Sequence, residues 1–295
     1  MVLVRTYDAK FASRTALSHL PSLLRFPALV WTNRYMVQNF LRRDLLSRVH
    51  GSVLGVYWLL LQPMFLFAIY FVVFGIFLGN PKVGTGADAS FAIYLFSGVI
   101  VFHALVEATS MGCSIITDNG NLVQKVAFPS EVLLVHPSIA ALVIYLVGAV
   151  VLLVAGLLTG VAQPGWLLCA MPLVLVVQFS LSLGLGMLLA STNVFLRDTT
   201  QVWRLITMAW MFFSPVFLRV ADLRDKLGET ATYWFEVLNP AWALIQAHRL
   251  VLGGDDPSLG SFWPSIGIAA AWAVAFLVLG YSLFMSRKHK FSDLI

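Results

Sequence analysis

Six long apolar segments alternate with short polar ones along the chain. A membrane-spanning helix needs about 20 mainly apolar residues, and each segment meets or approaches that length. They are Val56–Leu78, Phe91–Ile116, Val132–Leu158, Trp166–Ala190, Gln201–Leu218 and Phe262–Ser286. Because hydrocarbon offers no partner for backbone polar groups, a spanning helix must satisfy them internally. The pattern predicts an all-α integral membrane protein with six transmembrane helices.

The fifth segment is the weakest prediction, because Arg204 lies near its start and Pro215 near its end.

Two amphipathic segments occur in addition to the six apolar segments. In residues 28–50, apolar side chains recur every four or seven positions on one side and polar ones lie on another. Such a helix is expected to lie in the cytoplasmic membrane interface. A water-exposed helix at the membrane edge is the alternative.

The second amphipathic segment is Ala241–Leu252, which comes before the last span. Pro240 is suited to the first turn of a helix, and Gly253 with Gly254 is suited to ending one. Apolar residues continue through this segment although it lies between two predicted spans. We therefore expect a short helix that re-enters the membrane or lies on it.

The amino-acid composition narrows the class of protein. Of 295 residues, 59% are hydrophobic and only 11% are charged, and the mean hydropathy is +0.86. Soluble domains average about 45–50% apolar and about 25% charged residues, so a soluble protein or a disordered chain is excluded. The two cysteines, Cys113 and Cys169, indicate no disulfide framework.

The net charge of +5 is explained by its distribution. With both termini placed in the cytoplasm, 14 of the 19 lysines and arginines fall on the cytoplasmic side, as the positive-inside rule requires. We therefore read the charge as an orientation signal and a contact with anionic lipid, and expect no nucleic-acid partner. The predicted organisation is a cytoplasmic N-terminal region (1–55), a membrane domain (56–286) with an outer segment (219–261), and a basic cytoplasmic tail (287–295).

Sequence patterns for catalysis and metal binding are missing. No lysine lies in a GxxxxGK[ST] phosphate loop, so this chain is not expected to hydrolyse ATP. No HExxH or CxxC pattern occurs, so no metal site is predicted. We predict no catalytic residue and no cofactor in this chain.

One ionisable pair lies inside a predicted span: His103 and Glu107, four residues apart on one helix face. A charged carboxylate at the centre of a spanning helix costs about 2.5–3.5 kcal/mol on insertion scales. A neutral Glu107 hydrogen-bonded within the bundle and a Glu107 facing a hydrated path both remain open. A metal pair is disfavoured because two ligands are too few.

Aromatic residues form helical stripes on two spans. Their positions follow helical spacing and are Phe67, Tyr70, Phe74 and Phe77 in the first span, and Trp210, Phe213 and Phe217 in the fifth. Aromatic faces can stack on sugar rings, so these stripes are candidates for lining a channel. Packing against lipid or other helices is the alternative.

Four blocks of sequence resemble one family. They are LRRDLLSR with SVLGVYW and QP at residues 41–63, NLVQKVAFP at 121–129, NVFLRD with FFSPV at 193–216, and LNP with Arg249 and Gly253 at 238–253. Together and in this order they resemble ABC-2 type permeases of polysaccharide exporters. The segment Val49-His50 differs from that family, which more often has Tyr or Arg there.

The resemblance implies a permease subunit in a bacterial inner membrane. Two copies would pair with two copies of a separate ABC ATPase, which binds ATP and Mg, and would export a lipid-linked glycan such as O-antigen, capsule or a teichoic-acid-type polymer. The ATPase would dock on two cytoplasmic segments, through Asp118, Asn121, Lys125, Phe128, Arg197 and Asp198. Arg34, Arg42, Arg43 and Arg48 would meet the substrate phosphate or anionic lipid, and the outer segment 219–261 would form the gate.

Three other functions compete with this one. The first is an ABC-2 exporter of a drug or small lipid, which needs no long channel. The second is an intramembrane transferase that uses His103 and Glu107. The third is a non-catalytic scaffold, which should tolerate loss of the aromatic stripes.

Overall fold

The computed structural model describes residues 20–48, 51–73, 89–125, 129–161, 164–217, 220–253 and 260–294. Within these ranges the chain is almost entirely helical and contains no strand. Four of the described helical stretches are long and apolar enough to cross a membrane: Phe91–Asp118, Ser130–Thr159, Trp166–Asn193 and Phe262–Lys290. They correspond to the second, third, fourth and sixth predicted spans. The all-helical membrane class is thereby confirmed.

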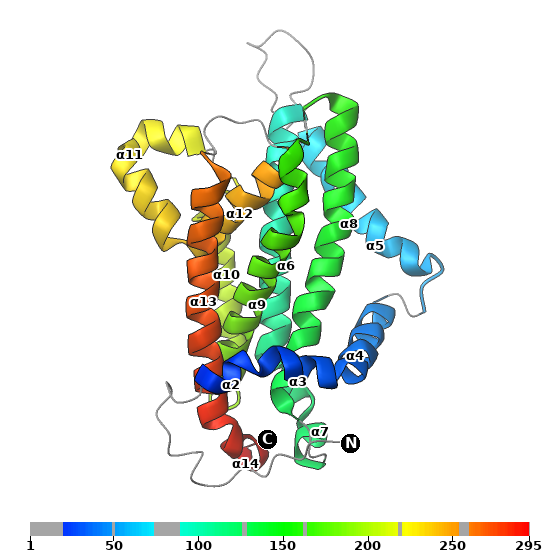
Figure 1. Cartoon of the computed structure of the whole chain (residues 1–295). Helices are drawn as coiled ribbons and strands as arrows, with labels where there is room; N and C mark the ends of the chain where they lie inside the picture. Colours follow the sequence, from blue (N-terminus) through cyan, green and yellow to red (C-terminus); the bar gives the residue numbers. More distant parts are fainter. Residues whose placement is uncertain are drawn as a thin grey trace.

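These stretches contain the four long helices of one bundle, which run side by side in Figure 1. The helices are α6 (Ala89–Asp118), α8 (Val135–Thr159), α9 (Met171–Asn193) and α13 (Phe262–Arg287). Helix α9 packs against both α6 and α13, and α8 packs against α6. Gly184 and Gly280 allow the closest approach, because a Cβ on Gly280 would overlap the carbonyl oxygen of Gly184. Small residues permit such contacts between membrane helices.

A short helix, α12 (Pro240–Val251), lies within this bundle (Figure 1). It packs against α13, α6 and α9, and all but one of its residues are buried. Asn239 caps its first turn by accepting a hydrogen bond from the backbone N–H of Ala241 at 3.1 Å. The bounds are within one residue of the predicted segment. Burial on all sides explains how such a short helix remains folded.

Within the described residues, the helices of the first and fifth predicted spans are shorter than the predicted segments. Helix α5 (Trp58–Tyr70) is followed by a wider helical turn to residue 73, and residues 74–88 lie outside the described ranges. Helix α10 (Thr199–Phe212) has 14 residues, so it is about 21 Å long. That is less than the hydrocarbon thickness of about 30 Å. The count of six spans therefore stays a prediction.

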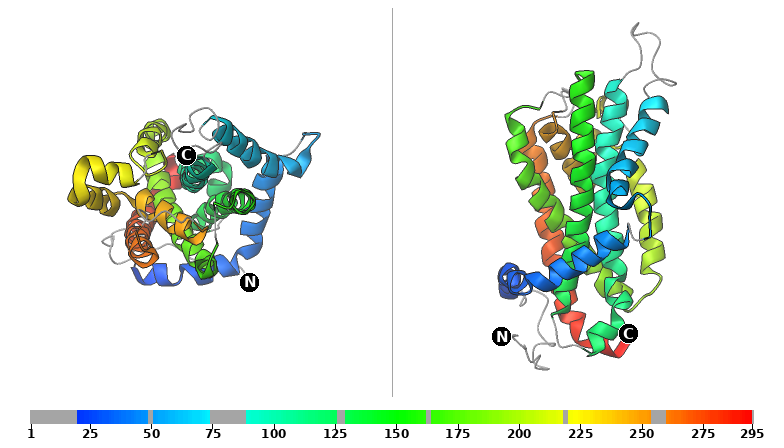
Figure 2. Two further views of the ribbon diagram at one scale, coloured as in Figure 1. Left: turned by 90° about the horizontal axis from the view of Figure 1, so that it is seen from above. Right: turned by 90° about the vertical axis from the view of Figure 1, so that its right-hand side faces the viewer.

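The N-terminal helices α2 (Leu20–Leu24), α3 (Phe26–Thr32) and α4 (Arg34–Ser47) lie across the bundle (Figures 1 and 2). The predicted helix 28–50 is thus two helices that break at Asn33, whose side-chain amide donates to the carbonyl oxygen of Leu29 at 2.8 Å. Two glycines with positive φ, Gly51 (76°) and Gly55 (50°), lie between α4 and α5. A left-handed backbone favours glycine at both positions.

The two ends of the bundle differ. At the lower end in Figure 1 lie α7 (Gly120–Lys125) and α14 (Phe291–Leu294), and α2 and α3 cross nearby. At the upper end lies α11 (Val220–Leu238), which bends at Gly228, where φ is 81°. We refer to these as the α7 end and the α11 end. The predicted outer segment 219–261 contains α11 and α12.

Candidate functional site

A charged cluster lies where the end of α4 meets the middle of α6. The guanidinium of Arg48 forms an ion pair with Glu107 and a second one with Asp44, at 3.2 Å between Nη2 and Oδ2. Burial alone would lower the pKa of Arg48, but Glu107 and Asp44 outweigh it and raise that pKa above its ordinary value. Glu107 therefore has a charged partner from the N-terminal region, which the sequence pattern did not indicate.

His103 completes this cluster. Its Nδ1 lies 3.7 Å from Oε2 of Glu107, one helical turn away, and its side chain is 62% exposed. The same Glu107 oxygen accepts no hydrogen bond from the described residues. Within those residues no three His, Cys, Asp or Glu side chains gather to hold a metal ion. His103 and Glu107 thus lie close together, with the His103 side chain at an open surface.

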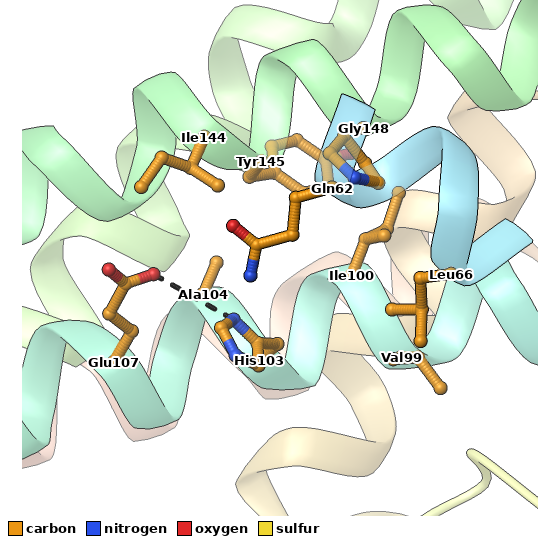
Figure 3. Close-up of a pocket in the computed structure, with 11 residues that line it drawn as sticks. Gln62, Leu66, Val99, Ile100, His103, Ala104, Glu107, Ile144, Tyr145 and Gly148 are labelled. Carbon is orange, nitrogen blue, oxygen red and sulfur yellow. Dashed lines mark ion pairs between the residues drawn. The ribbon is translucent and has the colours of Figure 1, made fainter. Parts of the chain in front are cut away.

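A cavity of about 70 Å³ adjoins the cluster between α5, α6 and α8. In Figure 3 Gln62 extends from α5 between the residues of α6 and α8. The polar side chains among the lining residues are Gln62, His103, Glu107 and Tyr145. A cavity of this size with several polar partners can hold a few water molecules. It is far too small to enclose a polymer.

The other three predicted interfacial arginines lie on α4. Arg34 lies over the rings of Trp31 and Tyr35, at 5.3 and 4.7 Å from their centroids. Arg43 lies 5.0 Å from the ring of Phe40, and Arg42 is exposed. Trp31 and Tyr35 are themselves exposed. Arginine with aromatic side chains suits a surface between lipid and water.

The aromatic stripe of the first span is only partly described, since Phe74 and Phe77 lie outside the described ranges. Phe67 packs edge-to-face on Phe96 of α6, with ring centroids 5.2 Å apart. Tyr70 is half-buried against the same hydrophobic core. These two aromatic side chains thus contact the bundle.

The aromatic residues of the fifth span lie in different environments. Trp210 is half-buried and donates from Nε1 to the Oδ1 atom of Asn239 at 2.7 Å. Phe217 stacks on Phe212, with centroids 5.5 Å apart. Phe213 is 62% exposed. Of the three, Phe213 presents the largest exposed aromatic face.

Both predicted ATPase-docking segments lie at the α7 end. Asp118 ends α6 and accepts a hydrogen bond from Ser114 at 2.6 Å. Asn121 is exposed on α7, and Lys125 is its last residue. Phe128 falls outside the described ranges. The α7 helix therefore presents part of this segment at the end of the bundle.

The second segment, Asn193–Asp198, begins at the last residue of α9 and lies beside the first. The side-chain amide of buried Asn193 donates to Oγ1 of Thr117, near the end of α6, at 3.5 Å. Arg197 and Asp198 are exposed in the following turn. Arg287 at the end of α13 lies 5.2 Å from the ring of Phe195 in that turn. Three long helices thus converge at the α7 end.

Several buried polar residues were not predicted as site residues. Arg249 on α12 is 2% exposed, donates to Ser97 and to the carbonyl oxygen of Tyr94 at 3.0 and 2.9 Å, and lies 3.5 Å from the Tyr94 ring. Gly98 leaves room for the guanidinium, because a Cβ there would lie 2.6 Å from Nη2. His248 shares a 2.6 Å hydrogen bond with Tyr145.

Comparison with known proteins decides the family. The family described as ABC-2 type transporter matches residues 35–252, a stretch that contains the charged cluster, both α7-end segments and Arg249. The chain belongs to this family. As a member it is a transporter membrane subunit, and ABC-2 permeases work with an ABC ATPase.

Two relatives bear the same name, O-antigen export system permease protein RfbA. The relative from Myxococcus xanthus is 25% identical over 273 residues, which cover 92% of this chain and 100% of the relative. One from Klebsiella pneumoniae is 20% identical over 254 residues, which cover 86% of this chain and 92% of the relative. This ABC-2 permease therefore matches these relatives over nearly their full length.

Proposed function

We propose that this chain is the transmembrane subunit of an ATP-driven exporter that moves a lipid-linked polysaccharide across the bacterial inner membrane. The observation that carries the proposal is the nearly full-length similarity to permeases named for O-antigen export. A relative matched end to end shares the whole permease rather than one module. O-antigen, capsule or a similar glycan would be the cargo.

The proposed arrangement has six spans with both termini in the cytoplasm, so that the α7 end faces the cytosol. The charge distribution supports this orientation. Two copies would assemble with two copies of the ABC ATPase, which would bind ATP and Mg. Exposed apolar residues on α5 and α10, including Phe65 and Phe212, support a second copy as their cover.

The path for the glycan would run beside the exposed side of α6. In Figure 2 this helix lies between α5 and α10 in the view from above. His103 and Ser110 are exposed on it, and Phe213 is exposed in the turn directly after α10. A threading polymer needs weak, repeated contacts, which exposed aromatic faces and single polar groups provide. The segments α11 and α12 would form the outer gate.

The cytoplasmic approach would be governed by the N-terminal helices. Exposed Arg42 and Arg43 can bind phosphate oxygens in a bidentate manner, so they would attract the phosphate linker or anionic lipid around it. Arg48 would join them only after separating from Glu107, because its guanidinium is held by two carboxylates.

The deciding experiment depletes this chain in cells and extracts glycan from the cytoplasmic face of the inner membrane and from the cell surface. The proposal expects full-length lipid-linked polymer to accumulate inside and to disappear from the surface. Normal surface glycan would contradict it and leave a small-molecule or lipid exporter. Absence of polymer everywhere would favour a transferase using His103 and Glu107.

A further inference from the structure

The last residues of the chain lie against α7. Helix α14 packs against α7, and Phe291, its first residue, is fully buried. The ring of Phe291 meets Phe284 of α13 edge-to-face, with centroids 5.1 Å apart. Phe291 belongs to a buried cluster that includes Ile116 of α6. The C-terminal segment 288–294 is therefore anchored in the protein rather than being only a basic tail.

A buried ion pair provides a second attachment. Lys288, directly after α13, pairs with Glu131, whose side chain is 2% exposed. Glu131 lies in η5 (Ser130–Leu134), the turn that leads into α8. Breaking a buried pair from one side is costly because it leaves the other charge uncompensated. The ion pair therefore links the end of the last long helix to the beginning of α8, just after the α7 segment.

Helix α7 depends on these neighbours for its orientation. It has six residues, and isolated helices shorter than about 12 residues are marginal in water. Leu122 and Val123 pack against the same buried cluster as Phe291, whereas Asn121 and Gln124 are exposed. One face of α7 is thus fixed to the bundle and the opposite face is open to a partner.

We propose that the C-terminal segment 288–294 is a brace that sets the orientation of α7 for docking of the ABC ATPase. This inference rests on the proposed function, because it takes the α7 end to be cytoplasmic and the partner to be the ATPase. Lys288 and Phe291 are positioning residues, and Asn121 and Gln124 form the docking face. A displacement of α7 by the ATPase would then be transmitted to α13 through α14. It would also be transmitted to α6 through the backbone that connects α6 to α7.

The test uses the full permease expressed with its ATPase, and measures the ATPase recovered per permease after affinity purification. Lys288→Met removes the buried cation, and Lys290→Met is its matched control because Lys290 is exposed two residues later. We expect Lys288→Met to lower ATPase recovery at least five-fold at unchanged permease abundance. Lys290→Met should leave the recovery within two-fold of wild type.

Charge reversal separates positioning from a general loss of folding. Glu131→Lys alone should behave like Lys288→Met, and Glu131→Lys with Lys288→Glu should restore at least half of the ATPase recovery. Phe291→Ala should lower the recovery, and Phe291→Leu should largely preserve it. Gln124→Lys on the open face of α7 should lower the recovery without changing the thermal stability of the permease.

Three results would overturn the inference. The first is equal ATPase recovery for Lys288→Met and Lys290→Met. The second is a loss that only follows permease abundance and is not restored by charge reversal. The third is failure of the wild-type permease to bind any ATPase, which would also overturn the proposed function and so differs from the first two.

Discussion

The packed side and the open side of this bundle use the same kinds of residues in different ways. On the packed side α9 lies between α6 and α13, and glycines bring backbones together. On the open side α5 and α10 are apolar, yet many of their large side chains are exposed. These include Leu60, Leu61, Met64, Phe65, Val202, Leu205, Ile206 and Phe212.

The contrast shows that apolarity alone does not reveal which surface of a membrane helix is internal. In lipid, an exposed leucine costs little, so packing depends on small residues and on polar groups that find partners. Gly112 and Gly186 illustrate this on the packed side, because a Cβ on Gly112 would lie 3.1 Å from the Cα of Gly186. We infer that lipid or a second copy covers the open side.

The largest effect is expected on the packed side. In Gly280→Ala the new methyl group collides with the backbone of Gly184, so α9 and α13 must separate. We expect a loss of about 3 kcal/mol in stability, typical of strong overpacking, measured by thermal unfolding in detergent. The control is Gly267→Ala on the same helix, where a Cβ meets nothing within 4 Å. Equal unfolding temperatures for the two variants would contradict this explanation.

The next largest effect is expected at Asn239, whose hydrogen bonds connect the open side to the packed side. Asn239 accepts from Trp210 and donates to the carbonyl oxygen of Phe213 at 2.9 Å, besides capping α12. Asn239→Ala should cost about 2 kcal/mol, from the lost cap and unpaired partners. Asn239→Asp keeps the acceptor and should lose less in the same unfolding assay. If both substitutions are neutral, α10 does not depend on this side chain.

A smaller effect is expected at the N-terminal attachment. Arg48→Ala removes the cation paired with Glu107, but the arginine side chain is 27% exposed, so solvent screening reduces the cost to about 1 kcal/mol. Glu107→Gln should add little once Arg48 is absent, which a double-mutant cycle can measure. Arg42→Ala, on an exposed residue, should not alter stability. Additive losses for Arg48 and Glu107 would argue against the pair.

The smallest stability change is expected on the open side. Phe65 is 70% exposed, so Phe65→Ala should change stability of one chain by less than about 0.5 kcal/mol. If a second copy covers α5, the same variant should reduce the dimer fraction in crosslinking and lower export at normal abundance. Val154→Ala, at an exposed position on α8, is the control and should affect neither. Identical crosslinking of both variants would favour lipid as the cover.

The sequence predicted four helices well because each apolar run exceeds 20 residues, so that even His103 and Glu107 do not end the second one. It overestimated the helix around Gln201–Leu218, where the structure has turns at residues 213–217 beside Pro215. It treated 28–50 as one helix, although Asn33 breaks it. Local patterns do not specify how far a helix continues once tertiary contacts decide its end.

The site was predicted less completely than the spans, since its contacts join distant parts of the chain. Glu107 was identified as an unusual carboxylate, but its partner Arg48 lies 59 positions earlier. Lys288 was counted only as one of several basic residues, because pairing with Glu131 depends on how α13 ends. Asn239 appeared within a motif, whereas its bond to Trp210 requires the folded bundle.

The burial of α12 bears on how the protein is made. Its polar residues Gln246, His248 and Arg249 are each at most 2% exposed, and one of the walls around them is α13, which leaves the ribosome later. During synthesis, α12 is therefore made before α13 and lies in the membrane or at its edge while one of the helices that bury it is still missing. The burial of α12 is complete only when α13 has been inserted. A chain cut short by a premature stop codon would lack the α13 wall beside α12, which makes it a natural target for membrane quality control.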